Sequence, residues 1–209
     1  TVTKLAGASV TAAYFAEKSP RVFVATRSGA SVYNTQTWKP EFNLPAQPPV
    51  TIARLSADGK LLAVGRSAAT NQQSIEVYRL PDTKPIHRDS GNWGHLTAIA
   101  FCPDTRHIAY AIQTGWEIRK VDLEGSDPRQ DFIGHSNRVL DLMFSQDEKR
   151  LFSVALDSTI RVWTTDTGRE ILLLKEQTGD QYIGLALSAD DKRLLAPSNA
   201  GRLYVFQAP

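Results

Sequence analysis

Three residues in the second half of the chain have the side chains of a nucleophilic catalytic triad. His135, Ser153 and Asp157 are the residue types with which a hydrolase activates a serine, because the histidine removes the hydroxyl proton and the aspartate orients the histidine. Trp163 follows them closely. A buried tryptophan N–H and a buried serine hydroxyl both need hydrogen-bond partners, so the same residues could instead form a closed structural network.

Paired carboxylates form a second group that could do chemistry, because two acids close together can serve general acid–base catalysis. They occur as Asp147-Glu148 and Asp190-Asp191. Each pair is followed at once by two basic residues and lies at an equivalent turn between two apolar segments. This pattern favours solvated, charge-balanced turns over an active site.

The sequence predicts no metal site and no cofactor. The four histidines, His87, His95, His107 and His135, do not share a ligand spacing with one another or with Cys102. Cys102 is the single cysteine, so an intrachain disulfide is excluded. It lies at the end of a predicted buried strand, where it is expected to act as a small apolar side chain.

The elements that position these residues are set by an internal repeat. Phe144 has counterparts at Phe15, Leu55, Phe101 and Leu187, and the successive spacings are 40, 46, 43 and 43 residues. A second anchor, Trp163, has counterparts at Tyr33, Tyr78, Val121 and Phe206. Two independent anchors in register indicate five copies of one structural unit.

Each copy has the pattern of short strands separated by turns. In the second copy, residues 51–55 alternate between apolar and polar, Asp58-Gly59 marks a tight turn, and residues 61–64 form an apolar strand. No stretch shows sustained 3.6-residue periodicity, so almost no helix is expected. The prediction is an all-β chain.

The segment Gly134–Trp163, with its Gly134-His135 start and Trp163 end, resembles the repeat of the WD40 β-propeller family. The resemblance extends over nearly all 209 residues. It implies one β-propeller domain, residues 1–209, with five four-stranded antiparallel blades. The blades are expected near residues 10–44, 50–88, 96–132, 139–174 and 182–206, with residues 2–5 completing the last. A closed five-blade ring and part of a larger, seven-bladed ring are both compatible with this arrangement.

The resemblance also assigns roles to the triad-like residues. In this family His135, Ser153, Asp157 and Trp163 would form a structural hydrogen-bond tetrad rather than a catalytic site. The sequence departs from the pattern elsewhere: Ala109 replaces the serine in the third copy, and the first, second and fifth copies lack the histidine. Thr164 stands where the family places an aspartate. Most blades are therefore expected to rely on apolar packing.

Partner binding is predicted for loops that would share one face of the propeller. They contribute Arg27, Arg66, Trp93 and Arg138, and arginine and tryptophan are enriched at interface hot spots. The alternative for Trp93 is that it packs under its own loop beside His95. The acid–base turns repeat one pattern and offer less to distinguish one blade from another.

Composition limits the classes of function. Apolar residues make up 42% and charged residues 22%, with a net charge of +2, which gives no reason to expect a nucleic-acid partner. No apolar run approaches the roughly 20 residues that span a bilayer, and a cytoplasmic location is expected.

The function predicted is a non-catalytic interaction scaffold or sensing module. We expect it to be the C-terminal part of a larger protein and to bind a protein partner or another domain of its parent chain. The alternative is a propeller enzyme or small-ligand binder that uses the central channel, although innermost positions such as Ala53 and Leu142 are small or apolar.

Overall fold

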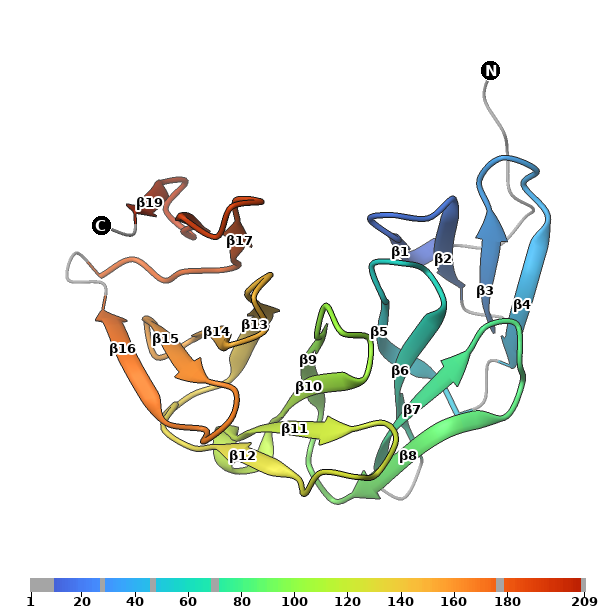
Figure 1. Cartoon of the computed structure of the whole chain (residues 1–209), viewed down its shortest axis with the longest axis horizontal. Coiled ribbons are helices and arrows are strands. Elements are labelled where there is room, and N and C mark those ends of the chain that lie inside the picture. The colour runs from blue at the N-terminus through green and yellow to red at the C-terminus, as the bar shows by residue number, and fades with distance from the viewer. Residues whose placement is uncertain (1–9, 27–28, 46–47, 69–71, 176–178, 208–209) are drawn as a thin grey trace. The chain divides into compact units, whose positions relative to one another are not determined.

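The computed structural model describes residues 10–26, 29–45, 48–68, 72–175 and 179–207. Within them the chain forms antiparallel strands and one short 3-10 helix, η1 (Thr114–Trp116) (Figure 1). Each strand pairs with its neighbour in sequence, so every sheet is a meander. The prediction of an all-β fold with almost no helix is confirmed.

The strands form five sheets, and each sheet falls on one of the five sequence repeats. Sheet 1 consists of β1 (Val10–Phe15), β2 (Arg21–Thr26), β3 (Gly29–Asn34) and β4 (Pro40–Pro45). Sheet 2 consists of β5 (Val50–Leu55), β6 (Leu61–Ser67), β7 (Gln73–Arg79) and β8 (Pro85–Gly91). Sheet 3 consists of β9 (Leu96–Phe101), β10 (His107–Ile112), β11 (Ile118–Asp122) and β12 (Gln130–Phe132).

Sheets 4 and 5 complete the series. Sheet 4 consists of β13 (Val139–Phe144), β14 (Arg150–Ala155), β15 (Thr159–Thr164) and β16 (Glu170–Lys175). Sheet 5 has three described strands, β17 (Ala186–Leu187), β18 (Arg193–Pro197) and β19 (Leu203–Gln207). The fourth strand predicted for it, at residues 2–5, lies outside the described residues, so the number of blades in a ring stays a prediction.

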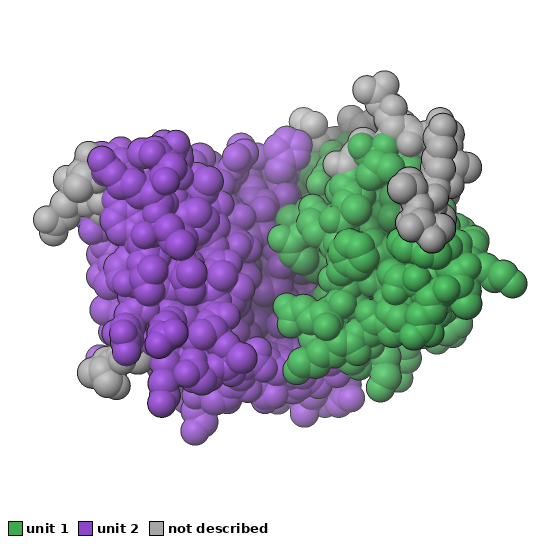
Figure 2. Space-filling view, turned by 90° about the horizontal axis from the view of Figure 1, so that it is seen from above, with its two compact units in different colours: residues 1–90 green, residues 91–209 purple. Residues whose placement is uncertain are grey.

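Contacts divide the chain into two compact units, residues 1–90 and residues 91–209, which Figure 2 shows in two colours. The first unit holds sheets 1 and 2, and the second holds sheets 3, 4 and 5, with Gly91 at the end of β8 on the boundary. Each unit has its own apolar core between neighbouring sheets.

Neighbouring sheets within a unit pack face to face, and alternate residues of a strand contact the preceding sheet and the following sheet. In sheet 4, Leu151 and Trp163 pair across two strands and point into the core shared with sheet 3. Phe152 and Val162 form the next pair and point into the core shared with sheet 5. We call the face toward the preceding sheet the leading face and the face toward the following sheet the trailing face. Because strand residues alternate between faces, both faces of such a sheet must be apolar.

The turn between the first two strands of a sheet has a recurring cap. Ser145 Oγ donates to Asp147 Oδ1 (2.5 Å) and accepts from Arg150 N (3.0 Å). Equivalent bonds join Ser56 to Asp58 and Ser188 to Asp190. In these three turns, and in the equivalent turn of sheet 3 where Cys102 replaces the serine, the residue after the aspartate lies in the left-handed region, with φ of 69° at Gly59, 55° at Thr105, 64° at Glu148 and 56° at Asp191. Gly59 accepts this value without strain, whereas the other three side chains do not.

Thr105 is the most strained of these turn residues because it is β-branched. We expect Thr105→Gly to raise the free energy of unfolding by up to about 1 kcal/mol, since a left-handed non-glycine residue costs about 1–2 kcal/mol and glycine returns part of this through its freer unfolded chain. Urea denaturation measures the change. A lower denaturation midpoint for the glycine variant would contradict the strain argument.

Candidate functional site

The triad-like residues meet in one hydrogen-bonded chain inside sheet 4. His135 Nδ1 lies 2.8 Å from Asp157 Oδ2, and His135 Nε2 lies 2.7 Å from Ser153 Oγ. Trp163 Nε1 donates to the same Ser153 Oγ over 2.8 Å. An aspartate that accepts from Nδ1–H leaves Nε2 as an acceptor, so the serine hydroxyl donates to the histidine while it accepts from the indole.

The carboxylate end of this chain is held in its charged form. Burial by itself would raise the pKa of Asp157, but hydrogen bonds from His135, Thr159 and the backbone N–H of Ser136 outweigh it and hold that pKa well below its usual range. Thr159 contributes two of them, from Oγ1 (2.6 Å) and from its backbone N–H (3.0 Å), both to Asp157 Oδ1. The charge thus orders the turn between β14 and β15 as well as the histidine.

Four separate elements bring the residues together. His135 precedes β13, Ser153 lies in β14, Asp157 lies in the following turn and Trp163 lies in β15. Gly134 makes the approach of the histidine loop possible. A Cβ at position 134 would lie 2.5 Å from Arg161 Nη1 and 3.0 Å from Trp163 Cη2, and Arg161 is itself fixed by its ion pair with Glu170 (2.6 Å).

Ser153 is poorly placed for nucleophilic chemistry. It has no exposed surface, and its oxygen already accepts from Trp163 while it bonds to His135. A triad serine must reach a substrate carbonyl beside free oxyanion donors. The arrangement therefore orders one sheet and offers no accessible nucleophile.

Sheet 2 contains a buried charged network, which corrects two expectations. Arg66 lies within the protein, 4% exposed, and its Nε pairs with Glu76 Oε2 at 3.0 Å. Tyr78 Oη donates to the same oxygen (2.6 Å), and Arg88 binds the other carboxylate oxygen. Burial removes Arg66 from the predicted partner surface. The missing histidine had suggested that sheet 2 relies on apolar packing alone. The buried ion pair between Arg66 and Glu76 shows that it does not.

Burial and pairing together set the charge state of this network. Burial would raise the pKa of Glu76, but the hydrogen bonds from Tyr78 and Arg88 and the charges of Arg88 and Arg66 lower it below its usual value. Burial, followed by the bond to Glu76, raises the pKa of Tyr78 to about 12. The tyrosine therefore stays a donor and the glutamate stays an anion.

Sheet 5 uses a third arrangement around Asp180, which is buried. Its Oδ2 accepts from Tyr204 Oη and Arg202 Nη1, both at 3.0 Å, and from Ser198 Oγ at 3.3 Å. Sheets 2, 4 and 5 thus each have a buried carboxylate, held by different partners.

Trp93 takes the alternative role given to it by the sequence. It is buried, its ring lies 6.0 Å from that of Tyr110, and the Arg119 guanidinium lies over it at 5.0 Å. Its indole nitrogen would lie 2.2 Å from a Cβ at Gly91. Because it packs within sheet 3, it is not available as an interface residue in the way predicted.

The two remaining arginines of the predicted partner surface have different outcomes. Arg27 lies outside the described residues. Arg138 is exposed beside the start of β13, and its neighbour Asn137 accepts from its backbone N–H (2.7 Å). Arg138 therefore stays a prediction for partner binding.

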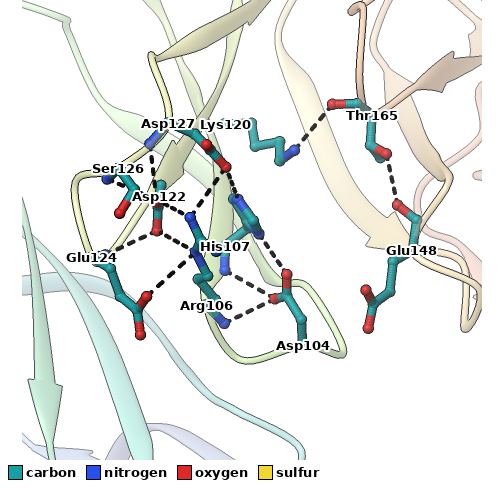
Figure 3. A network of polar contacts seen from close by, with 10 residues as sticks. All are labelled: Asp104, Arg106, His107, Lys120, Asp122, Glu124, Ser126, Asp127, Glu148 and Thr165. Carbon is teal, nitrogen blue, oxygen red and sulfur yellow. Dashed lines mark hydrogen bonds and ion pairs between the residues drawn. The ribbon is translucent and has the colours of Figure 1, made fainter.

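An ion cluster in sheet 3 was not found from the sequence. Asp122 is buried and binds Arg106 through two contacts, Oδ1 to Nε (3.0 Å) and Oδ2 to Nη2 (2.7 Å) (Figure 3). It also accepts backbone N–H bonds from Glu124, Ser126 and Asp127. The repeat offered one signal for it: Val121 is the counterpart of Trp163, so Asp122 stands at the position that Thr164 has in the fourth copy, where the resembled repeat places an aspartate.

The contacts of this cluster order a turn through ion pairs and hydrogen bonds. His107, Asp122 and Asp127 come close enough to share an ion. However, Asp122 directs both oxygens to Arg106 and to backbone donors, and the Arg106 bond is the main reason why the pKa of Asp122 lies far below its usual range. A divalent cation would have to displace or oppose a guanidinium that already supplies the positive charge.

The cysteine and the acid pairs have the environments that their sequence context indicated. Cys102 is buried, and burial raises its pKa to about 12, so it is a neutral apolar group. Asp147 and Asp190 are the turn caps described above, each exposed and followed by bases. Asp191 Oδ2 accepts from Gln146 N (2.7 Å) and so ties the turn of sheet 5 to that of sheet 4.

Comparison with known families matches residues 126–164 to the family described as "WD domain, G-beta repeat". This segment includes the four residues of the sheet 4 network. In the described part of the chain no helix is long and apolar enough to cross a membrane.

Two relatives are similar to this chain in sequence, and one solved structure is similar to it in fold. The "66 kDa stress protein" of Physarum polycephalum is 32% identical over 133 residues, which cover 60% of this chain and 20% of that protein. The "tRNA (guanine-N(7)-)-methyltransferase non-catalytic subunit wuho" of Drosophila yakuba is 28% identical over 154 residues, 69% of this chain and 31% of that protein. The chain thus spans less than a third of either relative. The structure of Kluyvelomyces marxianus Hsv2 matches 95% of this chain and 63% of its own with a TM-score of 0.76 at 16% identity, which shows the fold alone.

Removing a member of the sheet 4 network should lower stability. Asp157→Ala leaves His135 and Thr159 without their acceptor, and Trp163→Phe removes the indole donor to Ser153. We expect a loss of about 1–3 kcal/mol for each in urea denaturation, with unequal values. Asp166→Ala, at an exposed turn of the same sheet, is the matched control and should change stability by less than about 0.5 kcal/mol. An unchanged midpoint for either network variant would contradict the structural role.

The lowered pKa of Asp157 makes stability sensitive to acid. A depressed folded pKa contributes stability that is complete above the ordinary value of 3.8 and is lost as pH falls through that value toward the folded one. Asp157→Asn removes this titration. The difference in unfolding free energy between wild type and variant should therefore be largest above about pH 5 and shrink below about pH 4. A difference that stays constant down to pH 3 would show that Asp157 is not held as an anion.

Proposed function

The chain belongs to the WD40-repeat family of β-propeller proteins, and on this basis we propose that it is a non-catalytic interaction module that presents a rigid surface to a protein partner. The partner is either a separate protein or another domain of a larger parent chain. The relatives support the second possibility, because the matched region is a small part of each of them.

The observation that carries this proposal is that the residues which could have formed a catalytic site are buried and hydrogen-bonded to one another. The serine, histidine and aspartate that could have formed a catalytic site are all engaged in one buried network, and the serine has no exposed surface. The same holds for the buried carboxylates of sheets 2 and 5, which neutralise arginines and bind tyrosines. Polar residues in these sites stabilise sheets, so recognition is assigned to exposed loops.

The name of the Drosophila relative is consistent with this role, because it describes that protein as a non-catalytic subunit. Transferred to this chain, the name supports binding without turnover. It does not specify the partner, since the two relatives carry unrelated descriptions.

Arg138 is the described residue that best fits a recognition role. It lies in the loop that begins with the network histidine, so the rigid sheet 4 fixes its backbone through the bond from Leu156 N to Arg138 O (2.9 Å). An exposed guanidinium on an ordered loop can form bidentate contacts with a partner carboxylate at low entropic cost.

We expect Arg138→Ala to lower the yield of co-purified partner at least several-fold, whereas Lys192→Ala should leave it unchanged. Lys192 is the control because it is an exposed base in a repeating turn. Quantitative mass spectrometry of proteins retained by each folded variant measures the effect. Equal losses from both variants would contradict the assignment of the surface. An enzymatic activity that disappears in a folded Ser153→Ala variant would contradict the non-catalytic function.

A further inference from the structure

β16 differs from the other outer strands of the described sheets. It is the last strand of sheet 4, and among the described strands it pairs only with β15 (Figure 1). Such an edge leaves one row of backbone N–H and C=O groups without a strand partner, and proteins block it with proline, charge or short length. β4 begins and ends with proline, β8 begins with proline and contains Arg88 and Asp89, and β12 has three residues. β16 has six residues without proline, and its charged residues are only the first and the last.

The centre of β16 exposes apolar side chains on both faces. Ile171, Leu172 and Leu173 are consecutive in sequence and are 50%, 48% and 41% exposed. Consecutive side chains of a strand point to opposite faces, so an outer strand that stays in solvent is expected to be polar at these positions. β16 lies inside the chain, between sheet 3 and sheet 5 of the same compact unit, so its edge is set by the topology of sheet 4. A run of exposed apolar residues along such an edge indicates strand pairing with another chain.

Pairing with β15 fixes the face of each residue in β16. Lys175, Leu173 and Glu170 pair with alternate residues of β15, the last of which belongs to the core shared with sheet 3, so all three lie on the leading face. Leu174 and Leu172 pair with the residues of β15 in between and lie on the trailing face. A β-bulge between Leu172 and Glu170 keeps the spacing on the leading face even.

This order makes β16 complementary to itself. Lys175 and Glu170 lie one position to either side of Leu173 on the leading face, and Leu174 and Leu172 do so on the trailing face. Two copies of β16 can therefore lie antiparallel about a two-fold axis at Leu173. Lys175 of one copy then faces Glu170 of the other, and Leu172 faces Leu174. Opposite charges and apolar residues directly across a strand pair both stabilise the pairing.

The carboxylate of Glu170 is already oriented for this contact. Arg161 Nη1 binds Glu170 Oε2 at 2.6 Å, and no described residue bonds Glu170 Oε1. Arg161 is itself placed by Trp163, because its guanidinium lies over the indole ring at 6.0 Å. Lys175 is exposed. An oriented acceptor loses little conformational freedom when a lysine of a second copy binds it.

We propose that β16 of one copy pairs antiparallel with β16 of a second copy about a two-fold axis at Leu173, which joins sheet 4 of both copies into one continuous sheet. Both copies use the same strand, so the contact is isologous and closes at two copies. One strand pair is smaller than a standard protein interface, so the association is weak and depends on concentration. Arg138 precedes β13, at the opposite edge of sheet 4, so the dimer leaves that loop uncovered.

Two substitutions of one residue test the two-fold axis directly. Leu173 faces itself in the proposed dimer, so Leu173→Lys and Leu173→Glu each place two like charges opposite one another. When the two variants are mixed, a lysine of one copy faces a glutamate of the other. Leu173 is 41% exposed, and circular dichroism confirms that each variant is folded.

Sedimentation velocity over a hundredfold range of concentration gives the readout. The wild type should increase in mass with concentration up to two copies. Leu173→Lys and Leu173→Glu alone should stay at monomer mass, whereas their equimolar mixture should reach twice that mass.

A second variant and a control keep the test independent of position 173. Lys175→Glu changes an exposed side chain and places a carboxylate opposite Glu170 of the second copy, so it should also stay monomeric. Ile86→Lys is the matched control, because Ile86 is a 38% exposed apolar residue of the outer strand β8, and it should associate as the wild type does.

Four results would overturn the proposal. They are a wild type that stays monomeric at every concentration, a wild type that grows beyond two copies, a mixture of the two Leu173 variants that stays monomeric, and a loss of association in Ile86→Lys equal to that in Leu173→Lys.

Discussion

The structure depends on one constraint: a short antiparallel sheet with two apolar faces is stable only when both faces are covered. The second strand of a sheet shows this most clearly, because β6, β10 and β14 are buried along almost their whole length. Pairing with another strand cannot cover the faces of a sheet, because it satisfies the hydrogen bonds of the backbone and leaves the side chains on both faces exposed. The repeat is therefore a unit whose stability depends on its neighbours, and the apolar junctions are the main stabilising interaction of the chain.

Apolar packing between sheets is not directional, so it does not fix the conformation of the loops within each sheet. Buried polar networks fix that conformation. Sheet 4 uses the bonds among His135, Ser153 and Trp163, and sheet 2 uses the pairing of Glu76 with Arg66. A buried ion pair contributes little net stability over an apolar pair, but losing one partner is costly because the other charge is then buried alone. Each sheet can thus keep its own network, provided that all members of the network are retained together.

This division explains which features the sequence could predict. The repeat and the strands follow from periodicity, and the residues that meet in sheet 4 lie in one contiguous segment with a strong family pattern. Arg66 was misjudged because its burial depends on Glu76 and Tyr78, which lie beyond a long loop. Trp93 was ambiguous because its cover, Arg119, comes from another strand. Asp122 was missed because the residue before it is Val121, where the other copies have an aromatic residue. Without that aromatic residue, the sequence pattern does not mark the aspartate.

The polar ties between sheets also determine how strongly each junction holds. Sheet 4 anchors sheet 5 with more than apolar contact: Asp141 Oδ2 accepts from Leu185 N (3.1 Å), and Gln146 N donates to Asp191 (2.7 Å). Sheet 5 has Gly184 at the position equivalent to Asp141, so its own trailing face lacks that carboxylate. A sheet packed on this face would be held by apolar burial without that directional bond. The polar ties of the junction between sheets 4 and 5 are therefore specific to that pair of sheets.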